Sequence, residues 1–348
     1  MRPHFSHRRQ SGFLMIEHDK PVTIVDIAKD TGLSIATVSR ALNNSQKVTD
    51  KTRRKIKESA SRLKYIPNEG AKALVQGTTN TIGLLLNDLS PASNTVYTIL
   101  NEMTAKRDYK LLVFNSLNQI NSQEHCIIDM LNRRITGIII IPLPGAYHSL
   151  EPIYNSGTPC VIINRFVREF NFSHVIFDFR IGVCEAVDYL VISRQRKHFF
   201  QLANMDVYAG LERRKAFQFA LKANQIDHSY NPVYPVDDSF KSGYEAMSLI
   251  LNEHPEADAV ICSSDYTAAG AIRACRDNKK KVPEDISITG YYNSEISEYF
   301  IPRISSIDAN FSELCRTALD KMIAMIKNHE DHPENFSLPT RFIRRETS

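Results

Sequence analysis

The chain of 348 residues is long enough for two or three folding units, and its content of 43% hydrophobic and 24% charged residues is ordinary for a globular protein. Its apolar runs are too short to cross a bilayer, no secretory signal is readable, and its six cysteines are scattered without a C-x-x-C pair, so we expect a cytoplasmic protein with reduced thiols. Residues 1–80 hold 15 lysines and arginines against 7 acids, whereas residues 81–348 hold 28 against 32, which favours contact of the N-terminal part with a polyanion.

Two short amphipathic helices around a glycine-centred turn are predicted within VTIVDIAKDTGLSIATVSRAL, residues 22–42. Thr23 is the expected N-cap of the first helix and Ser34 that of the second. In the second helix, Val38 and Leu42 lie four residues apart and face inward. This arrangement is a helix-turn-helix, whose second helix enters the major groove of DNA.

A third helix is expected at about residues 49–63, with Arg53, Arg54, Lys55 and Lys57 crowding its start. Such a cluster is either a solvated helix face or a phosphate-binding surface, and its place beside a helix-turn-helix favours phosphate contact. A further short helix at about residues 69–76 is too short to be stable alone, so we expect it to order on DNA together with a second copy.

These segments, VTIVDIAKDTGLSIATVSRALNN, KTRRKIKESASRLKYIPN and AKALVQG, resemble in order and spacing the LacI/GalR family of bacterial repressors. The resemblance implies that Ile35 and Ala36 open the recognition helix, that Arg40 is its second base-reading position, and that Leu74 wedges into the minor groove. The short apolar pair suits thymine methyl groups, so we expect Arg40 to read guanine. The other expected DNA contacts are Thr23, Ser34, Thr37, Ser39, Asn43, Tyr65, Asn68 and Lys72.

The expected organisation is an N-terminal extension (1–20), a helix-turn-helix domain (21–67), a hinge (68–79) and an effector-binding and dimerisation domain (80–348). The extension lies outside the family pattern. It is either a mis-assigned start, with translation beginning at Met15, or a loose basic arm.

From residue 81 apolar runs alternate with amphipathic stretches, which is the βαβ rhythm of parallel sheets covered on both faces. Strands are expected at residues 82–86, 111–114, 137–141, 160–163, 174–177, 199–203, 259–262 and 286–290. Helices are expected at residues 124–133, 213–223, 243–253 and 267–278. This pattern predicts two doubly wound α/β lobes, about 80–177 with 308–335 and 178–307 with 336–348, around a cleft at the carboxyl ends of the strands.

The resemblance extends to the end of the chain, where RRITGIIIIP, SSDYTAAGAIRAC and VPEDISITGYYN correspond to the family's periplasmic-binding-protein-like domain. It implies a homodimer, because no leucine heptads that would build a tetramer follow the last segment. It also implies an effector cleft in which Arg213 keeps the family's arginine. The other expected effector-binding residues are Ser93, Asn94, Asn164, Asp238, Phe240, Ser264, Asp265 and Tyr292.

Several cleft positions depart from the family pattern: Asn164 stands where an acid is common, Asp238 replaces a stacking aromatic, and Tyr292 replaces a carboxylate. Three interpretations remain open. The ligand is of another kind, smaller or anionic and held by the same arginine; or neighbours such as Phe240 and Tyr266 rebuild a sugar site; or the cleft is vestigial and a protein partner controls the regulator.

No phosphate-binding loop, dinucleotide fingerprint, nucleophile elbow or zinc-protease motif occurs in the sequence, so we expect no enzyme, no metal and no cofactor. The sequence therefore predicts a DNA-binding transcriptional regulator, a repressor that acts as a dimer on a pseudo-palindromic operator. A small sugar-like or other effector would control it, and control by a protein partner is the alternative.

Overall fold

The structure, a computed structural model, describes residues 22–42, 45, 47–66, 79–205, 208–226, 233–328 and 332–348. The chain divides into two compact units, Met1–Lys72 and Ala73–Ser348, which are treated separately below. The N-terminal extension and the hinge helix expected at residues 69–76 lie outside the described residues. So do four expected DNA contacts: Asn43, Asn68, Lys72 and Leu74.

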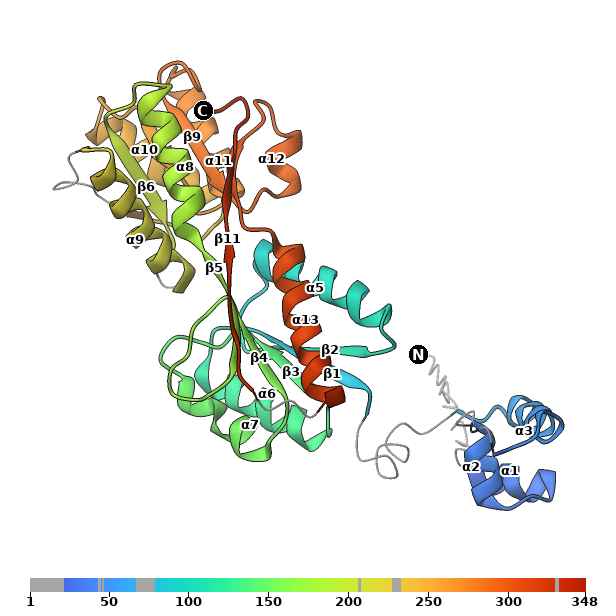
Figure 1. Cartoon of the computed structure of the whole chain (residues 1–348). Helices are drawn as coiled ribbons and strands as arrows, with labels where there is room; N and C mark the ends of the chain where they lie inside the picture. The colour runs from blue at the N-terminus through green and yellow to red at the C-terminus, as the bar shows by residue number, and fades with distance from the viewer. Residues whose placement is uncertain are drawn as a thin grey trace, which may run out of the picture. The chain divides into compact units, whose positions relative to one another are not determined.

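The N-terminal unit contains the three expected helices, α1 (Ile24–Thr31), α2 (Ile35–Leu42) and α3 (Asp50–Arg62), shown in blue in Figure 1. Their shared core is small and apolar, with side chains from all three helices fully buried: Ile27, Val38, Ala41 and Ile56. Gly32 ends α1 with a φ of 68°, a conformation that glycine adopts without a steric penalty. The carboxylate of Asp26 accepts hydrogen bonds from the backbone N and Oγ1 of Thr23, which lower its pKa.

The second unit is built on two six-stranded sheets, one in each lobe. The N-lobe sheet has the order β11-β5-β4-β3-β1-β2, and the C-lobe sheet the order β12-β10-β9-β8-β6-β7. The N-lobe strands are β1 (Thr81–Leu86), β2 (Lys110–Asn115), β3 (Gly137–Ile140), β4 (Cys160–Ile163), β5 (Ser173–Asp178) and β11 (Asn335–Pro339). The C-lobe strands are β6 (Phe199–Ala203), β7 (Val233–Pro235), β8 (Ala259–Ile261), β9 (Ser287–Tyr291), β10 (Ser305–Asp308) and β12 (Arg341–Ile343).

Helices cover both faces of each sheet, as the βαβ rhythm requires (Figure 1). In β1, successive side chains point to opposite faces of the sheet: Leu84 packs in a core with α5 and α13, and Leu85 packs in another core with α6. The N-lobe helices are α5 (Pro91–Ala105), α6 (Ile120–Asn132), the 3₁₀ turn η1 (Tyr147–Leu150), α7 (Glu151–Ser156) and α13 (Phe311–Asn328). The C-lobe helices are α8 (Phe179–Ile192), α9 (Tyr208–Ala223), α10 (Phe240–Glu253), α11 (Asp265–Asp277) and α12 (Glu295–Tyr299). None of the helices in the described ranges is long and apolar enough to span a membrane.

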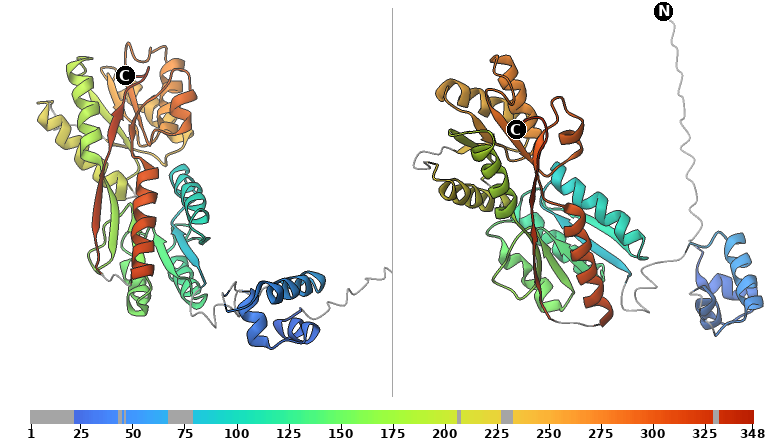
Figure 2. Two further views of the ribbon diagram at one scale, coloured as in Figure 1. Left: turned by 45° about the vertical axis from the view of Figure 1, so that its right-hand side comes forward. Right: turned by 45° about the horizontal axis from the view of Figure 1, so that its top comes forward.

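The chain passes between the lobes from β5 to α8, from β10 to α13, and from β11 to β12. The expected boundary between residues 335 and 336 is wrong, because β11 pairs in parallel with β5 as far as Pro339 and so belongs to the N-lobe. Figures 1 and 2 show β5 and β11 side by side at this passage. Thr340 lies at the crossing, where its hydroxyl donates to the carbonyl of Asp178 at 2.9 Å.

Candidate DNA-binding surface and effector cleft

The expected reading residues of α2 lie on its exposed face. Ile35 is 49% exposed although it is apolar, and Ala36 and Arg40 are also exposed. The hydroxyls of Ser34 and Thr37 instead bond to each other at 2.8 Å, and Ser34 Oγ accepts from the backbone N of Thr37 at 3.2 Å, so they cap the helix. The remaining three described contacts are Thr23, which is exposed, and Ser39 and Tyr65, which are half-buried.

The basic cluster of α3 divides into two kinds of residue. Arg53 Nη2 donates to the backbone carbonyls of Ser45 and Val48 at 2.9 and 3.3 Å, and Lys55 Nζ donates to the carbonyl of Thr31 at 2.8 Å. These two side chains therefore tie α3 to the preceding loop and to the end of α1. Arg54, Lys55 and Lys57 are exposed, and contact of the four cations with phosphate stays a prediction.

Two adjoining cavities of about 670 and 750 Å³ lie between the lobes. Both are lined by residues of the N-lobe and of the C-lobe, namely Ser90, Ala92, Asp238, Tyr292 and Phe311. The smaller cavity is also lined by the expected residues Ser93 and Asn164, and the larger by Asn94 and Ser264. The cleft thus lies where the doubly wound pattern predicts it, beyond the carboxyl ends of the strands.

Several residues of the cleft wall have unusual backbone conformations. Six non-glycine residues there have positive φ: Asn118 (55°), Asn164 (56°), Asp238 (66°), Tyr292 (90°), Asn293 (50°) and Asn310 (39°). For a bulky side chain such as Tyr292 this conformation is an outlier, which costs about 1–3 kcal/mol and persists only where the surroundings impose it. Such strain is typical of ligand sites.

Arg213 does not line either cavity, contrary to its expected role as the donor to the effector. It is 3% exposed; its Nη1 donates to the carbonyl of Ser263 at 2.7 Å and its Nη2 to the hydroxyl of Tyr292. Its guanidinium lies 4.3–5.0 Å from the ring centroids of Phe179, Tyr291 and Tyr292. The tyrosine at position 292 is longer than the carboxylate it replaces, and its ring separates the arginine from the cleft.

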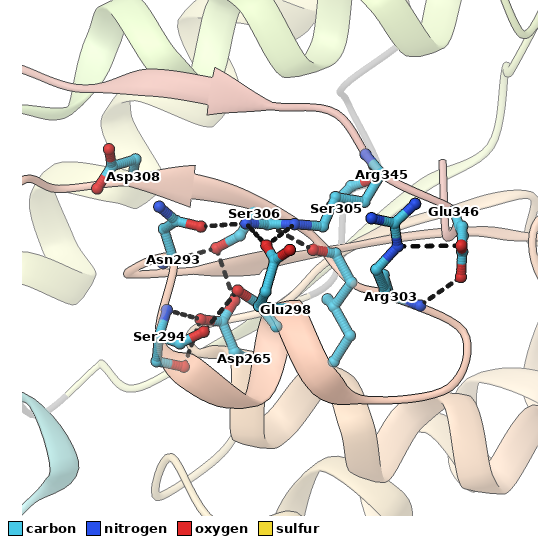
Figure 3. A network of polar contacts seen from close by, with 12 residues as sticks. Asp265, Asn293, Ser294, Glu298, Arg303, Ser305, Ser306, Asp308, Arg345 and Glu346 are labelled. Carbon is cyan, nitrogen blue, oxygen red and sulfur yellow. Dashed lines mark hydrogen bonds and ion pairs between the residues drawn. The ribbon is translucent and has the colours of Figure 1, made fainter.

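Asp265 also lines neither cavity. It is fully buried, and its carboxylate accepts from the backbone N and Oγ of Ser294 at 2.7 Å each and from Ser306 Oγ at 2.6 Å (Figure 3). Burial raises its pKa to about 6. Arg345 Nη2 donates to Asn293 Oδ1 at 2.6 Å. The loop of Asn293 and Ser294 is therefore bound to two side chains, Arg345 and Asp265.

The other expected aromatic lies off the cleft. Phe240 is 44% exposed, lines neither cavity, and packs edge-on against Tyr266 with 5.0 Å between ring centroids. Tyr266 does line the larger cavity. Ser264 caps α11 by accepting from the backbone N of Thr267 at 3.1 Å. Among the described residues, no group of three or more His, Cys, Asp or Glu side chains is arranged to hold a metal ion.

Polar residues that we did not select from the sequence complete the smaller cavity. Five of them are Asp88, Arg165, Asn204, Tyr208 and Asp237. All but Tyr208 follow closely on a strand, β1, β4, β6 or β7. Since ligands of doubly wound sheets bind beyond the carboxyl ends of strands, this position is the signal that could have identified them.

Comparison with known proteins agrees with this architecture. Residues 23–68 match the family described as "Bacterial regulatory proteins, lacI family", and residues 187–348 match the "Periplasmic binding protein-like domain". Catabolite control protein A of Staphylococcus epidermidis is 28% identical, over 94% of this chain and 99% of that protein. The regulator GalR of Escherichia coli is 26% identical, over 88% of this chain and 90% of that protein. A crystal structure of the Lac repressor dimer bound to operator and the anti-inducer ONPF gives a TM-score of 0.85 at 25% identity, covering 94% of this chain and 99% of that one.

A helix-turn-helix unit joined to a two-lobed domain with a cleft between its lobes defines a one-component transcriptional regulator, in which one chain holds both the DNA-reading and the ligand-binding part. The chain carries a LacI-family DNA-binding domain and a periplasmic-binding-protein-like domain, and the relatives it matches are LacI/GalR-type regulators. The resemblance and the fold class expected from the sequence are therefore confirmed.

Proposed function

We propose that this protein is a homodimeric repressor that binds a pseudo-palindromic operator and is controlled by a small effector bound between its lobes. Two copies place α2 in successive major grooves, where Ile35 and Ala36 contact base methyl groups and Arg40 donates to guanine. Leu74 of each copy enters the central minor groove, and the bend it produces brings more protein into contact with DNA.

The observation that carries this proposal is the exposure of Ile35, Ala36 and Arg40 together at one face of α2, on a folded three-helix unit. The Lac repressor structures to which the chain is similar contain an operator with ONPF, or ONPG. Several curated relatives, GalR among them, are named as HTH-type transcriptional regulators, so we also propose that the chain acts on DNA in the cytoplasm and is not an enzyme. Their names give no support to control by a protein partner.

A ligand bound in the cleft controls the binding of the operator. Cavities lined by both lobes allow a ligand to change the angle between the lobes, and with it the distance between the two hinge segments of a dimer. Effector and operator are then linked by a coupling free energy of about 1–3 kcal/mol, and each changes the affinity for the other by the same factor.

Selection of binding sites from a random DNA library with the purified protein tests the proposal. We expect a symmetric site that binds at least about a thousandfold more tightly than random DNA at near-physiological salt. Arg40→Ala should relax the preference at one base pair of each half-site, whereas the control Arg54→Ala should weaken all sequences equally. A monomeric protein without preference for any symmetric site would contradict the proposal.

A further inference from the structure

A buried arginine without an acidic partner lies on the wall of the smaller cavity. Arg165 follows β4 and is only 3% exposed. Among the residues that the structure describes, its one hydrogen-bond acceptor is Tyr147 Oη, 3.4 Å from Nη1, and its buried Nε has no partner. Within the described ranges, no carboxylate forms an ion pair with it.

This environment is unusual for a guanidinium, which always carries its charge and has five N–H donors. Arg345 of the same unit, whose side chain is 10% exposed, shows the ordinary solution: its guanidinium binds Glu298 at 2.9 Å, Asn293 Oδ1 at 2.6 Å and the carbonyl of Ile304 at 3.0 Å. Arg213, which like Arg165 forms no ion pair with a described carboxylate, still donates to the carbonyl of Ser263 at 2.7 Å and to the hydroxyl of Tyr292, and it lies against three rings. Arg165 has almost none of these partners. Because a buried charge without a partner is unfavourable, the structure indicates that a partner of Arg165 comes from outside the described residues, and a ligand of the cavity can supply it.

Arg165 also lies at the junction of the lobes. It belongs to the N-lobe, but its guanidinium is 5.5 Å from the ring centroid of Tyr208, the first residue of α9 in the C-lobe. Its neighbour Asn164 has one of the strained conformations of the cleft wall. A negative group bound to Arg165 would therefore touch both lobes and favour their closed arrangement.

Three carboxylates line the same cavity, and they limit what else the ligand carries. Asp88 Oδ1 accepts from the backbone N of Ser90 at 3.0 Å, and Asp237 Oδ1 accepts from that of Ser239 at 3.1 Å. Asp238 Oδ2 accepts from an amide at 3.4 Å, and its buried Oδ1 has no partner. These oxygens are acceptors, so the ligand groups that suit them are donors such as hydroxyls.

We infer that the effector of this protein is a hydroxylated small acid, a sugar acid or sugar phosphate rather than a neutral sugar. Its carboxylate or phosphate binds Arg165, and its hydroxyls donate to the cleft carboxylates. The inference rests on the proposed function, since it assigns a chemical class to the effector of that cleft. Arg165, rather than Arg213, is then the cleft arginine that contacts ligand.

Titration calorimetry on the full-length protein without DNA tests the inference. The probes are D-gluconate, D-galacturonate, D-glucose 6-phosphate and D-ribose 5-phosphate, each compared with its neutral parent sugar, and inorganic phosphate alone. We expect at least one acid to bind tenfold or more tightly than its parent. Arg165→Met should weaken that binding by about 10- to 100-fold, the range of a hydrogen bond to a charged group, and Arg165→Lys by less. The control Arg168→Met, at an exposed arginine three residues further along, should leave it unchanged.

Binding of only the carboxylates or only the phosphates supports the inference and identifies the anionic group. Any of three results would overturn the inference. The first is equal affinity for the acids and their parent sugars. The second is that no acid binds at 10 mM, which corresponds to roughly 3 kcal/mol of binding free energy. The third is an unchanged affinity of Arg165→Met for the acid. The melting temperature of ligand-free Arg165→Met should not fall, because the substitution removes an unpaired charge. A lower melting temperature with unchanged acid affinity would make Arg165 structural and also overturn the inference. Release of operator by a neutral sugar would leave the proposed function standing and overturn this inference alone.

Discussion

The buried carboxyl of Asp265 makes the stability of the effector domain depend on pH in an unusual direction. Its pKa rises from an ordinary 3.8 to about 6 because burial disfavours the charged form. The folded state therefore holds the proton more tightly than the unfolded state. This contribution to stability is complete below about pH 4 and is lost as the pH rises through about 6. A difference of about two pKa units corresponds to about 3 kcal/mol.

The Asp265→Asn variant isolates this effect. Its amide keeps one oxygen for the two donors of Ser294 and places an N–H₂ beside Ser306 Oγ, which can accept as well as donate. Relative to the wild type, we expect the variant to gain up to about 3 kcal/mol of unfolding free energy between pH 4 and pH 7. Urea unfolding followed by circular dichroism at several pH values measures the difference.

The matched control is Glu298→Gln, which changes a half-exposed acid of the same polar network (Figure 3) and should give no pH-dependent difference of this size. Ser306→Ala, in a chain that keeps Asp265, removes one hydrogen-bond donor to the carboxylate, which should raise the pKa of Asp265 further. The unfolding free energy of this variant should therefore fall more steeply with rising pH than that of the wild type. A stability difference between wild type and Asp265→Asn that stays flat from pH 4 to pH 7, or that has the opposite slope, would refute the reasoning.

Four further substitutions test other parts of the molecule. Arg213→Met should lower the unfolding free energy by about 2–4 kcal/mol, because the carbonyl of Ser263 and three aromatic rings lose the buried cation that they contact. Normal stability together with loss of effector binding would show instead that the arginine contacts the ligand. Lys55→Met should lower the unfolding free energy of the helix-turn-helix unit by about 1–2 kcal/mol, because the carbonyl of Thr31 loses its donor. Lys57→Met should only weaken DNA binding and reduce its salt dependence by about one ion. The reverse pattern in melting and salt-titration experiments would contradict these different roles of the two lysines. Leu74→Ala should weaken specific DNA binding far more than non-specific binding in competition assays, and equal losses would remove the minor-groove wedge.

Much of the fold could be predicted because local patterns determine it. The three helices of the N-terminal unit follow from the caps at Thr23 and Ser34 and from the apolar spacing around Val38. Eight strands were predicted from runs that are mostly apolar, as the strands of covered parallel sheets are. Four strands, β7, β10, β11 and β12, were not predicted. They are short or polar: β10 reads SSID, and β11 alternates between exposed and half-buried residues.

The cleft could be placed from the sequence, but the orientation of its side chains could not. A family pattern locates Arg213 near the effector, whereas the backbone conformation of Tyr292, with a φ of 90°, determines that a ring covers it. Arg165 was not selected, because its importance depends on the partners it lacks, and those are visible only in three dimensions. The same holds for Arg53 and Lys55, whose acceptors are carbonyls of other segments.

The interleaved passage of the chain between the lobes also constrains how the protein forms during synthesis. The N-lobe takes α13, with its buried Leu314, Leu319 and Met322, and its edge strand β11 from the last part of the chain. Translation therefore has to reach Pro339 before that lobe can bury its core, although more than half of its residues emerged early. The helix-turn-helix unit, whose contacts are local, can fold while the rest is still being made. A nascent chain would thus carry a folded helix-turn-helix unit well before its effector-binding domain has folded and can control DNA binding.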